Sequence, residues 1–399
     1  MFATEQCTPS EEIQSRLRCL RSALAGREVD AALIFQKMDL FYFSGTIQQG
    51  QLYVPADGEP VLMVRKSAER AQAESPVANQ VFLEKLEQMR RIVAKQSAAL
   101  PRRIGLELDV IPAKLYLSLG DIFPEAEFVD VSDEIRTLRA VKSVYEIARI
   151  KEAARCADRV AAFVADELKE GMSEVELAGR VEAEARRLGH QGFVRMRLWD
   201  HELFYGHLMA GPGAAVPSYL ASPTGGAALS PAVAQGASLR PIRAREPVLV
   251  DYVFAKDGYL ADHTRIFAVR GLDDDLMQAH QTALDIQTAL VEQLQPGTVS
   301  GALYEKAVSL AADRGYAAFF MGAESSRIRF VGHGIGLELD EFPFLAKGQD
   351  RRLESGMTIA LEPKMIIPGR GVVGIENTHV VTEQGSEQIT RFSEAVTII

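Results

Sequence analysis

The spacing of apolar residues divides the chain into a first part, in which short strand and helix patterns alternate, and a second part that opens on long helices. In the first part, residues 52–54 and 61–64 flank the turn residues 56–59 and predict a hairpin. Further buried strands are predicted at 31–35, 104–108 and 128–131, with amphipathic helical segments near 85–99 and 112–119. This alternation predicts an α/β domain.

From Ser143 the pattern becomes helical over longer stretches. Ser143 and Glu146 have the spacing of a capping box, and apolar residues then recur at helical intervals as far as residue 168. Similar helical patterns cover residues 173–188 and 274–294, whereas residues 221–238, rich in Gly, Pro, Ala and Ser, predict a long loop. We therefore expect an α/β domain over residues 1–142 and an α+β domain over residues 143–399.

Two acidic residues stand in apolar, strand-like runs of the second domain. Asp251 lies in VLVDYVF and Asp262 in YLADHTRIF, and the residues between the runs predict a tight hairpin turn. An odd separation across a two-residue turn places both side chains on one face of the hairpin. Facing, half-buried carboxylates repel each other, so a bound cation is the natural remedy. The alternative is that Asp262 pairs with Arg265 and that Asp251 caps a sheet edge.

A second acidic pair follows the same plan. Glu362 and Glu376 follow apolar runs and lie symmetrically about Gly369, so a second hairpin would set them side by side. Between the two hairpins, FVGHGIG offers His333 in what reads as a glycine-rich loop, with a backbone free to approach a ligand closely. Four carboxylates and a neutral imidazole suit two divalent ions that share bridging oxygens.

Composition narrows the class of protein. The 399 residues are 47% hydrophobic and 25% charged, ordinary values for a globular chain of two domains. The net charge of −10 disfavours nucleic acid as a partner. Three cysteines without CxxC spacing predict neither a disulfide framework nor a zinc knuckle. The chain shows no signal-peptide pattern and no long apolar stretch, so we expect a soluble cytoplasmic protein without a membrane partner.

These residues resemble the M24 metallopeptidase family of Xaa-Pro aminopeptidases, prolidases and methionine aminopeptidases, which share the creatinase or "pita-bread" fold. The resemblance rests on VDYVFAKDGYLADHTRIF, GHGIGLELDEFP and GMTIALEPKMIIPGRGVVGIEN, and on an α/β first domain of the type seen in the prolidase branch. It implies an α/β N-terminal domain followed by a pita-bread catalytic domain. It also implies a homodimer and two divalent ions, of Mn, Co, Fe or Zn.

The resemblance further implies a role for each ligand. Asp251 would hold one ion, Asp262 and Glu376 would bridge both, and His333 and Glu362 would complete the shell of the other. Glu362 would also be catalytic, accepting the proton of a bridging hydroxide that attacks the carbonyl of a small peptide or amide and passing it to the leaving amine.

Three departures from the family pattern concern groups that bind the substrate carbonyl in relatives. Ser218, Asp340 and Gly374 stand where peptidases of this branch usually have His, His and Arg. An ionised aspartate cannot donate to an oxyanion, so we expect Asp340 to act as a base or to bind a cationic part of the substrate; the alternative is a rim salt bridge. We predict Ser218 and His207 as substrate-binding residues, His207 belonging to the aromatic segment 195–207 with Trp199, His201 and Tyr205.

The leading hypothesis is therefore a dinuclear metal hydrolase of the Xaa-Pro dipeptidase type. The departures motivate two alternatives. In one, the same metal core serves another reaction, such as the carbon–sulfur lysis of the dimethylsulfoniopropionate lyases in this superfamily. In the other, the protein is a non-catalytic binding module.

Overall fold

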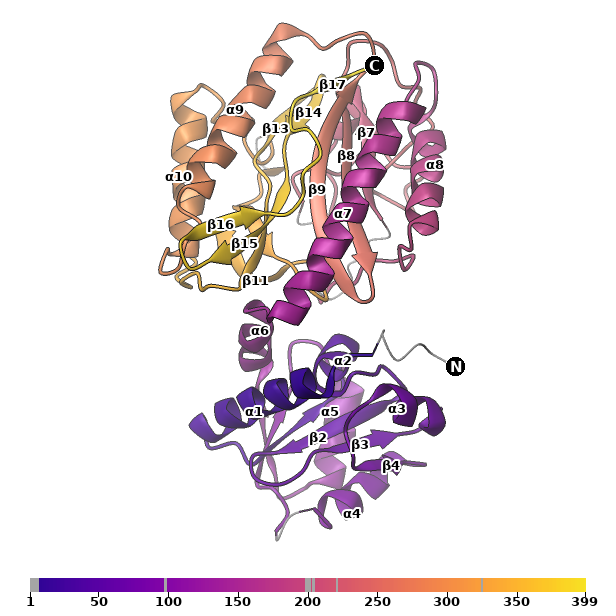
Figure 1. Cartoon of the computed structure of the whole chain (residues 1–399), viewed down its shortest axis with the longest axis vertical. Helices are drawn as coiled ribbons and strands as arrows, with labels where there is room; N and C mark the ends of the chain where they lie inside the picture. Colours follow the sequence, from indigo (N-terminus) through magenta and orange to yellow (C-terminus); the bar gives the residue numbers. More distant parts are fainter. Residues whose placement is uncertain (1–6, 97–98, 198–201, 203–204, 220–221, 324–325) are drawn as a thin grey trace. The chain divides into compact units, whose positions relative to one another are not determined.

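The computed structural model describes residues 7–96, 99–197, 202, 205–219, 222–323 and 326–399. The chain folds as two compact units, Met1–Arg139 and Ala140–Ile399 (Figure 1). We keep the domain boundary after residue 142 as a prediction.

The first unit is built on a six-stranded mixed sheet with the strand order β4-β3-β2-β1-β5-β6. Its strands are β1 (Ala31–Ile34), β2 (Gly50–Pro55), β3 (Val61–Val64), β4 (Gln80–Phe82), β5 (Arg103–Leu106) and β6 (Glu127–Asp130). Its helices are α1 (Ser10–Gly26), α2 (Lys37–Ser44), α3 (Ala68–Glu74), α4 (Met89–Val93) and α5 (Ala113–Ile122), the short 3-10 helix η2 (Leu86–Gln88), and α6 (Ser132–Ala140), which ends at the division between the units.

The structure confirms the predicted hairpin of this unit, since β2 and β3 pair antiparallel with Tyr53 opposite Val61. The parallel pairs β1–β5 and β5–β6 account for the strand and helix alternation seen in the sequence. A buried ion pair, with Arg139 Nη1 2.6 Å from Asp39 Oδ1, ties the last helix to α2.

The second unit contains a four-stranded sheet of order β17-β9-β8-β7, a five-stranded sheet of order β11-β10-β12-β15-β16 and the two-stranded ribbon β13-β14. Its strands are β7 (Gly206–Ala210), β8 (Val248–Lys256), β9 (Tyr259–Ala268), β10 (Phe330–Gly334), β11 (Glu341–Ala346), β12 (Thr358–Leu361), β13 (Lys364–Ile367), β14 (Gly371–Gly374), β15 (Asn377–Thr382), β16 (Gly385–Gln388) and β17 (Thr397–Ile398). Its helices are α7 (Val144–Glu167), α8 (Glu174–Arg187), α9 (Asp274–Val291) and α10 (Ser300–Asp313), with the short 3-10 helix η3 (Gly211–Ala215).

The helices lie in two pairs on opposite sides of the sheets. In Figure 1, α7 and α8 lie against β7, β8 and β9, while α9 and α10 lie on the side of β13, β14 and β11. The apolar faces of α9 and α10 pack against strand residues such as Leu249, Ile359 and Val373 in one hydrophobic core. The polar cluster of this unit lies on β8, β9, β10 and β13 and at the two junctions β12–β13 and β14–β15.

Local sequence signals explain where these elements begin. The capping box at α7 is confirmed: the Glu146 amide donates to Ser143 Oγ at 3.2 Å, and the Ser143 amide donates to Glu146 Oε2 at 3.1 Å. At the start of α8, the Glu176 amide donates to Ser173 Oγ at 3.2 Å, which is one of the two bonds of a capping box. Helix α10 carries no such cap and was not predicted. In the described part of the predicted loop 221–238, residues 222–238 form no helix or extended strand, as expected.

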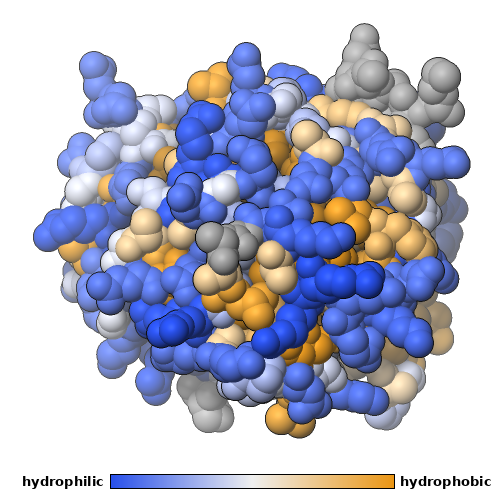
Figure 2. All heavy atoms as spheres, turned by 90° about the horizontal axis from the view of Figure 1, so that it is seen from below, coloured by the Kyte–Doolittle hydropathy of each residue, from blue (hydrophilic) through white to orange (hydrophobic). Residues whose placement is uncertain are grey.

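The surface shown in Figure 2 is mostly hydrophilic, with apolar side chains in small separate groups. Among the described residues, no helix combines the length and the apolar character needed to cross a membrane.

Candidate metal centre

The first acidic pair lies on the β8–β9 hairpin. Val253 pairs with Asp262 and Asp251 with Thr264, so the two aspartates lie one diagonal apart on the same face. Asp257 and Gly258 form the two-residue turn with φ angles of 50° and 91°, the left-handed conformation that such a turn requires. The predicted geometry is confirmed. The predicted alternative is not found, because Arg265 donates to Asn377 Oδ1 and to backbone carbonyls.

The second acidic pair, Glu362 and Glu376, lies on a two-stranded ribbon. Along this ribbon the β12–β15 pairing is continued by the β13–β14 pairing in the same register. Leu361 of β12 pairs with Asn377 of β15, and Lys364 of β13 pairs with Gly374 of β14. Glu362 and Glu376 lie opposite each other at the junction between these pairings, so the hairpin about Gly369 is confirmed. The chain departs from regular pairing where the two carboxylates turn inward.

His333 comes from a strand, which corrects the expectation of a glycine-rich loop. It lies on β10 and pairs with Ala360 of β12. The flanking glycines serve close strand packing, because a Cβ on Gly334 would lie 2.1 Å from the carbonyl oxygen of Phe342. What these glycines approach closely is therefore neighbouring backbone.

These elements bring the predicted ligands into one pocket. Asp262, His333 and Glu376 are buried, and each offers a ligand atom within 4.8 Å of the others. The same pocket is lined by the other predicted ligands, Asp251 and Glu362, by Asp340 and His207, and by Lys364. The sequence thus predicted the convergence of all five ligands; their metal-binding roles stay predictions.

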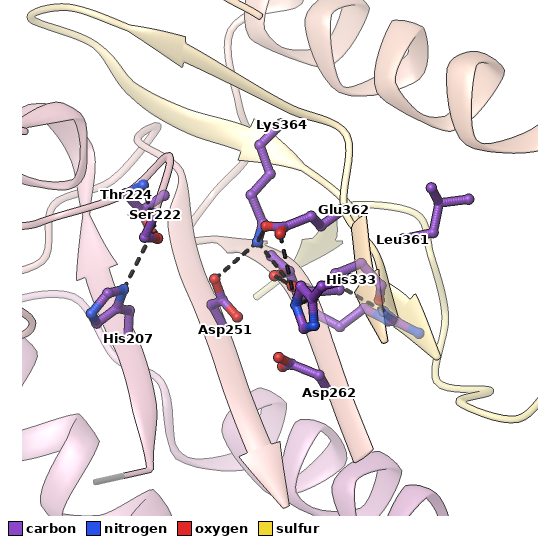
Figure 3. A network of polar contacts seen from close by, with 12 residues as sticks. His207, Ser222, Thr224, Asp251, Asp262, His333, Leu361, Glu362 and Lys364 are labelled. Atoms are coloured by element: carbon purple, nitrogen blue, oxygen red, sulfur yellow. Dashed lines mark hydrogen bonds and ion pairs between the residues drawn. The ribbon is translucent and has the colours of Figure 1, made fainter. Parts of the chain in front are cut away.

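Lys364 was not predicted, and it occupies the middle of this cluster. Its ammonium group donates to Asp251 Oδ2 at 3.0 Å, Glu362 Oε2 at 2.7 Å and Glu376 Oε2 at 2.8 Å. Figure 3 shows the side chain extending from its strand to a nitrogen between Asp251 and Glu362, with Asp262 apart from these bonds. Only 1% of this side chain is exposed, so the charge is fully committed to the carboxylates.

The sequence did contain a signal for Lys364. The residue follows Glu362 by two positions at the start of an apolar strand, and side chains two apart in an extended segment share a face. A lysine on the same face as a predicted buried ligand must either pair with an acidic residue or extend its ammonium group to solvent.

The electrostatics of the cluster follow from burial and from its excess of negative charge. Burial, with the neighbouring Glu376 and Asp251 carboxylates, holds the pKa of Asp262 well above its ordinary value. Burial also raises the pKa of Glu376 to about 7, although Lys364 opposes the shift. Burial alone would raise the pKa of Asp251, but Lys364, together with His207 and a hydrogen bond from Thr264, lowers it.

The imidazole of His333 is oriented toward the cluster. Its Nδ1 lies 3.0 Å from the carbonyl oxygen of Gly334 and 3.6 Å from Asp340 Oδ1, while Nε2 lies 3.8 Å from both Glu362 Oε1 and Glu376 Oε1. Burial alone would lower the pKa of His333, but Asp340 and the two glutamates raise it. Asp340 therefore faces Nδ1, the ring nitrogen that points away from the two glutamates. The backbone of Asp340 is held in the left-handed region, with a φ of 61°.

The two predicted substrate-binding residues differ in their positions. His207 lies on β7 opposite Asp251, lines the pocket and has both ring nitrogens 3.2 Å from neighbours, Thr224 Oγ1 and Gln235 Oε1. Ser218 is not among the described residues that line the pocket, and its hydroxyl donates to the Ala234 carbonyl at 2.6 Å. Trp199 and His201 lie outside the described residues. Both roles, for His207 and Ser218, stay predictions.

The donor set at Asp262, His333 and Glu376 fits a divalent ion. Two carboxylates and an imidazole are ligands that Mn, Fe, Co and Zn accept. Within the described part of the chain, Asp262 Oδ1 is buried without a hydrogen-bond partner, which costs free energy unless a cation or proton satisfies it. A second ion beside Asp251 does not fit in the same way, because the ammonium group of Lys364 already lies against that carboxylate.

Comparison with known proteins agrees with this fold. The Xaa-Pro dipeptidase of Pyrococcus furiosus is 27% identical over 95% of this chain and 98% of its own. The crystal structure of the prolidase from Pyrococcus horikoshii OT3 has a TM-score of 0.80 at 24% identity, covering 95% of this chain and 99% of that chain. The structure of the Xaa-Pro dipeptidase from Bacillus anthracis has a TM-score of 0.83 at 24% identity, covering 97% and 100%.

Family comparison covers both units. Residues 16–141 match the creatinase/prolidase N-terminal domain, and residues 148–383 match metallopeptidase family M24. The predicted fold, an α/β N-terminal domain followed by a pita-bread catalytic domain, is confirmed. Because the second match alone spans more than half of the 399 residues, the chain belongs to metallopeptidase family M24.

Proposed function

We propose that this protein is a metal-dependent hydrolase that cleaves short Xaa-Pro peptides. The observation that supports the proposal is the buried group Asp262, His333 and Glu376, in a pocket that also holds Glu362 and Asp340. The similarity to Xaa-Pro dipeptidases supports the substrate class. The proposal needs one divalent ion at this group; the sequence led us to expect two.

A bound divalent ion would polarise the scissile carbonyl and make water available as a nucleophile near neutral pH. The protein supplies the proton transfer. Glu362 gives Oε2 to Lys364 and turns Oε1 toward His333, so one carboxylate oxygen is left to accept a proton from the attacking water and to pass it to the leaving amine. We therefore propose Glu362 as the catalytic base and acid.

Asp340 has a positioning role in this proposal. Its carboxylate faces His333 Nδ1 and helps to fix the orientation in which Nε2 points into the cluster. It also adds to the negative charge of the pocket, which favours a substrate with a free amino terminus. His207, whose ring nitrogens are both engaged, would form part of the pocket wall. We also keep the homodimer and the cytoplasmic location as predictions.

The test is hydrolysis of an Xaa-Pro dipeptide by protein that has been stripped with a chelator and then reloaded with Mn²⁺ or Co²⁺. The expected result is turnover that depends on the ion and that is greater for the Xaa-Pro order than for the reversed Pro-Xaa dipeptide. Glu362→Gln should lower kcat by about 10²- to 10⁴-fold, the usual contribution of a general acid–base group.

Glu387→Gln is the matched control, because Glu387 forms an ion pair with Lys151 outside the pocket and should leave kcat unchanged. Absence of turnover on any Xaa-Pro peptide, in protein shown to be loaded with metal, would refute the proposed activity. An untargeted substrate screen would then distinguish a lyase that uses the same site from a binding module.

A further inference from the structure

The ammonium group of Lys364 is placed as a cation shared by three carboxylates. A lysine ammonium has three N–H donors, and here each has its own acceptor, at 2.7 to 3.0 Å, on Glu362, Glu376 and Asp251. Charge-assisted bonds of this length are the strong class. The side chain therefore links one residue of the first hairpin to both glutamates of the second.

Two of these acceptors are ligands expected for one of the two ions. The family resemblance assigns Asp251 to that ion alone and makes Glu376 a bridging ligand. Both carboxylates give an oxygen to Lys364, and Asp251 is bound to no other cation among the described residues. The ammonium group thus lies where the resemblance expects a divalent ion.

The two glutamates divide their oxygens between this cation and a second position. Oε2 of both accepts from Lys364, while Oε1 of both lies 3.8 Å from His333 Nε2. Thr264 Oγ1 donates to Glu376 Oε2 at 2.8 Å and helps to fix this orientation. The oxygens that remain face the position formed with Asp262, whose Oδ1 has no partner in the described chain.

The backbone opposite Lys364 leaves room for its side chain. Its cross-strand partner is Gly374, and a Cβ there would lie 2.7 Å from Lys364 Cα and 3.0 Å from its Cγ. Gly374 is also the position where relatives were expected to carry an arginine. The absence of a side chain at 374 and the presence of a cationic one at 364 therefore belong to one arrangement.

We propose that the ammonium group of Lys364 replaces one of the two divalent ions, so that this protein binds a single ion at Asp262, His333 and Glu376. A divalent ion brought to the position of Lys364 would be repelled by the ammonium and would have to displace its three bonds. The inference rests on the proposed metal dependence but not on the identity of the peptide substrate.

The test counts bound metal. Purified full-length protein is saturated with Mn²⁺, and bound manganese per chain is measured by equilibrium dialysis with elemental analysis, with electron paramagnetic resonance on the same samples. We expect one ion per chain and a spectrum without coupling between manganese ions. Lys364→Ala, which opens the space and removes the charge, should bind two ions and show coupling. Lys151→Ala, a lysine with an ion pair to Glu387 outside the pocket, should bind one.

Each outcome decides a separate point. Two ions in the unaltered protein would overturn the inference while leaving the proposed function intact. No bound ion in the unaltered protein would overturn both. If the unaltered protein and a folded Lys364→Ala variant each bind one ion, Lys364 is not the residue that excludes the second ion. If Lys364→Ala does not fold, the count and the spectrum of the unaltered protein decide alone.

Discussion

His379 allows a quantitative prediction about stability and pH. The residue lies on β15 between β12 and β16, it is fully buried, and neither ring nitrogen has a hydrogen-bond partner among the described residues. Burial lowers its pKa from 6.5 to about 4. The folded protein therefore resists protonation of this ring, whereas the unfolded chain takes up the proton below pH 6.5.

The sign and size follow from linkage. Because the unfolded state binds the extra proton, His379 costs stability as the pH falls from about 6.5 toward 4, and the cost is absent above pH 7. At about 1.4 kcal/mol per pKa unit, the cost is about 2 kcal/mol at pH 5 and about 3 kcal/mol below pH 4. His379→Phe, which keeps a flat ring and cannot be protonated, should reduce the loss of stability between pH 8 and pH 5 by about 2 kcal/mol.

The assay is urea unfolding at pH 8 and pH 5 with chelator present, so that metal binding does not contribute. Unfolding is followed by far-ultraviolet circular dichroism, which reports the loss of helix and strand. Val380→Ala is the control, because it removes buried apolar volume without a titratable group and should cost the same at both pH values. An equal pH 8 to pH 5 difference in the parent protein and in His379→Phe would refute the reasoning.

Three further predictions concern the site and its support. Asp340→Asn removes the charge facing His333 and should weaken Mn²⁺ binding by about 10- to 100-fold in equilibrium dialysis; an unchanged affinity would show that Asp340 does not support the imidazole. Gly374→Ala places a Cβ against Lys364 and should lower the free energy of unfolding by about 1 to 3 kcal/mol; unchanged stability would mean that the ribbon relaxes freely. Ser143→Ala removes the cap of α7 and should cost about 1 kcal/mol in urea unfolding, with the loss absent if solvent satisfies the Glu146 amide equally well.

The parts of the site that the sequence predicted are those governed by strand parity. The separation of Asp251 from Asp262 and the symmetry of Glu362 and Glu376 about Gly369 both fix which side chains share a face, because alternation in a strand is strict. The capping box at Ser143 is similarly local. Such signals depend on a few neighbouring residues and survive in the folded chain.

The parts that were missed depend on long-range packing. His333 was assigned to a loop because its glycines resemble loop residues, and only the approach of β11 and β12 shows that they permit strand contact. Helix α10 has no side-chain cap to mark its start. Lys364 changes the expected charge balance of the site because its partners come from the first hairpin, more than 100 residues earlier, as well as from its own ribbon.

Arg265 ties the end of the chain to the pocket. Its guanidinium donates to the backbone carbonyl of Glu376 at 2.8 Å and to that of Phe392 at 2.9 Å, so a buried charge connects the segment before β17 to a candidate ligand. Deleting the chain from Phe392 onward would strand this guanidinium in the interior and loosen the backbone that carries Glu376. Affinity tags and fusions should therefore be added after Ile399 and should not replace residues 392–399, because these residues help to hold the backbone of the pocket in place.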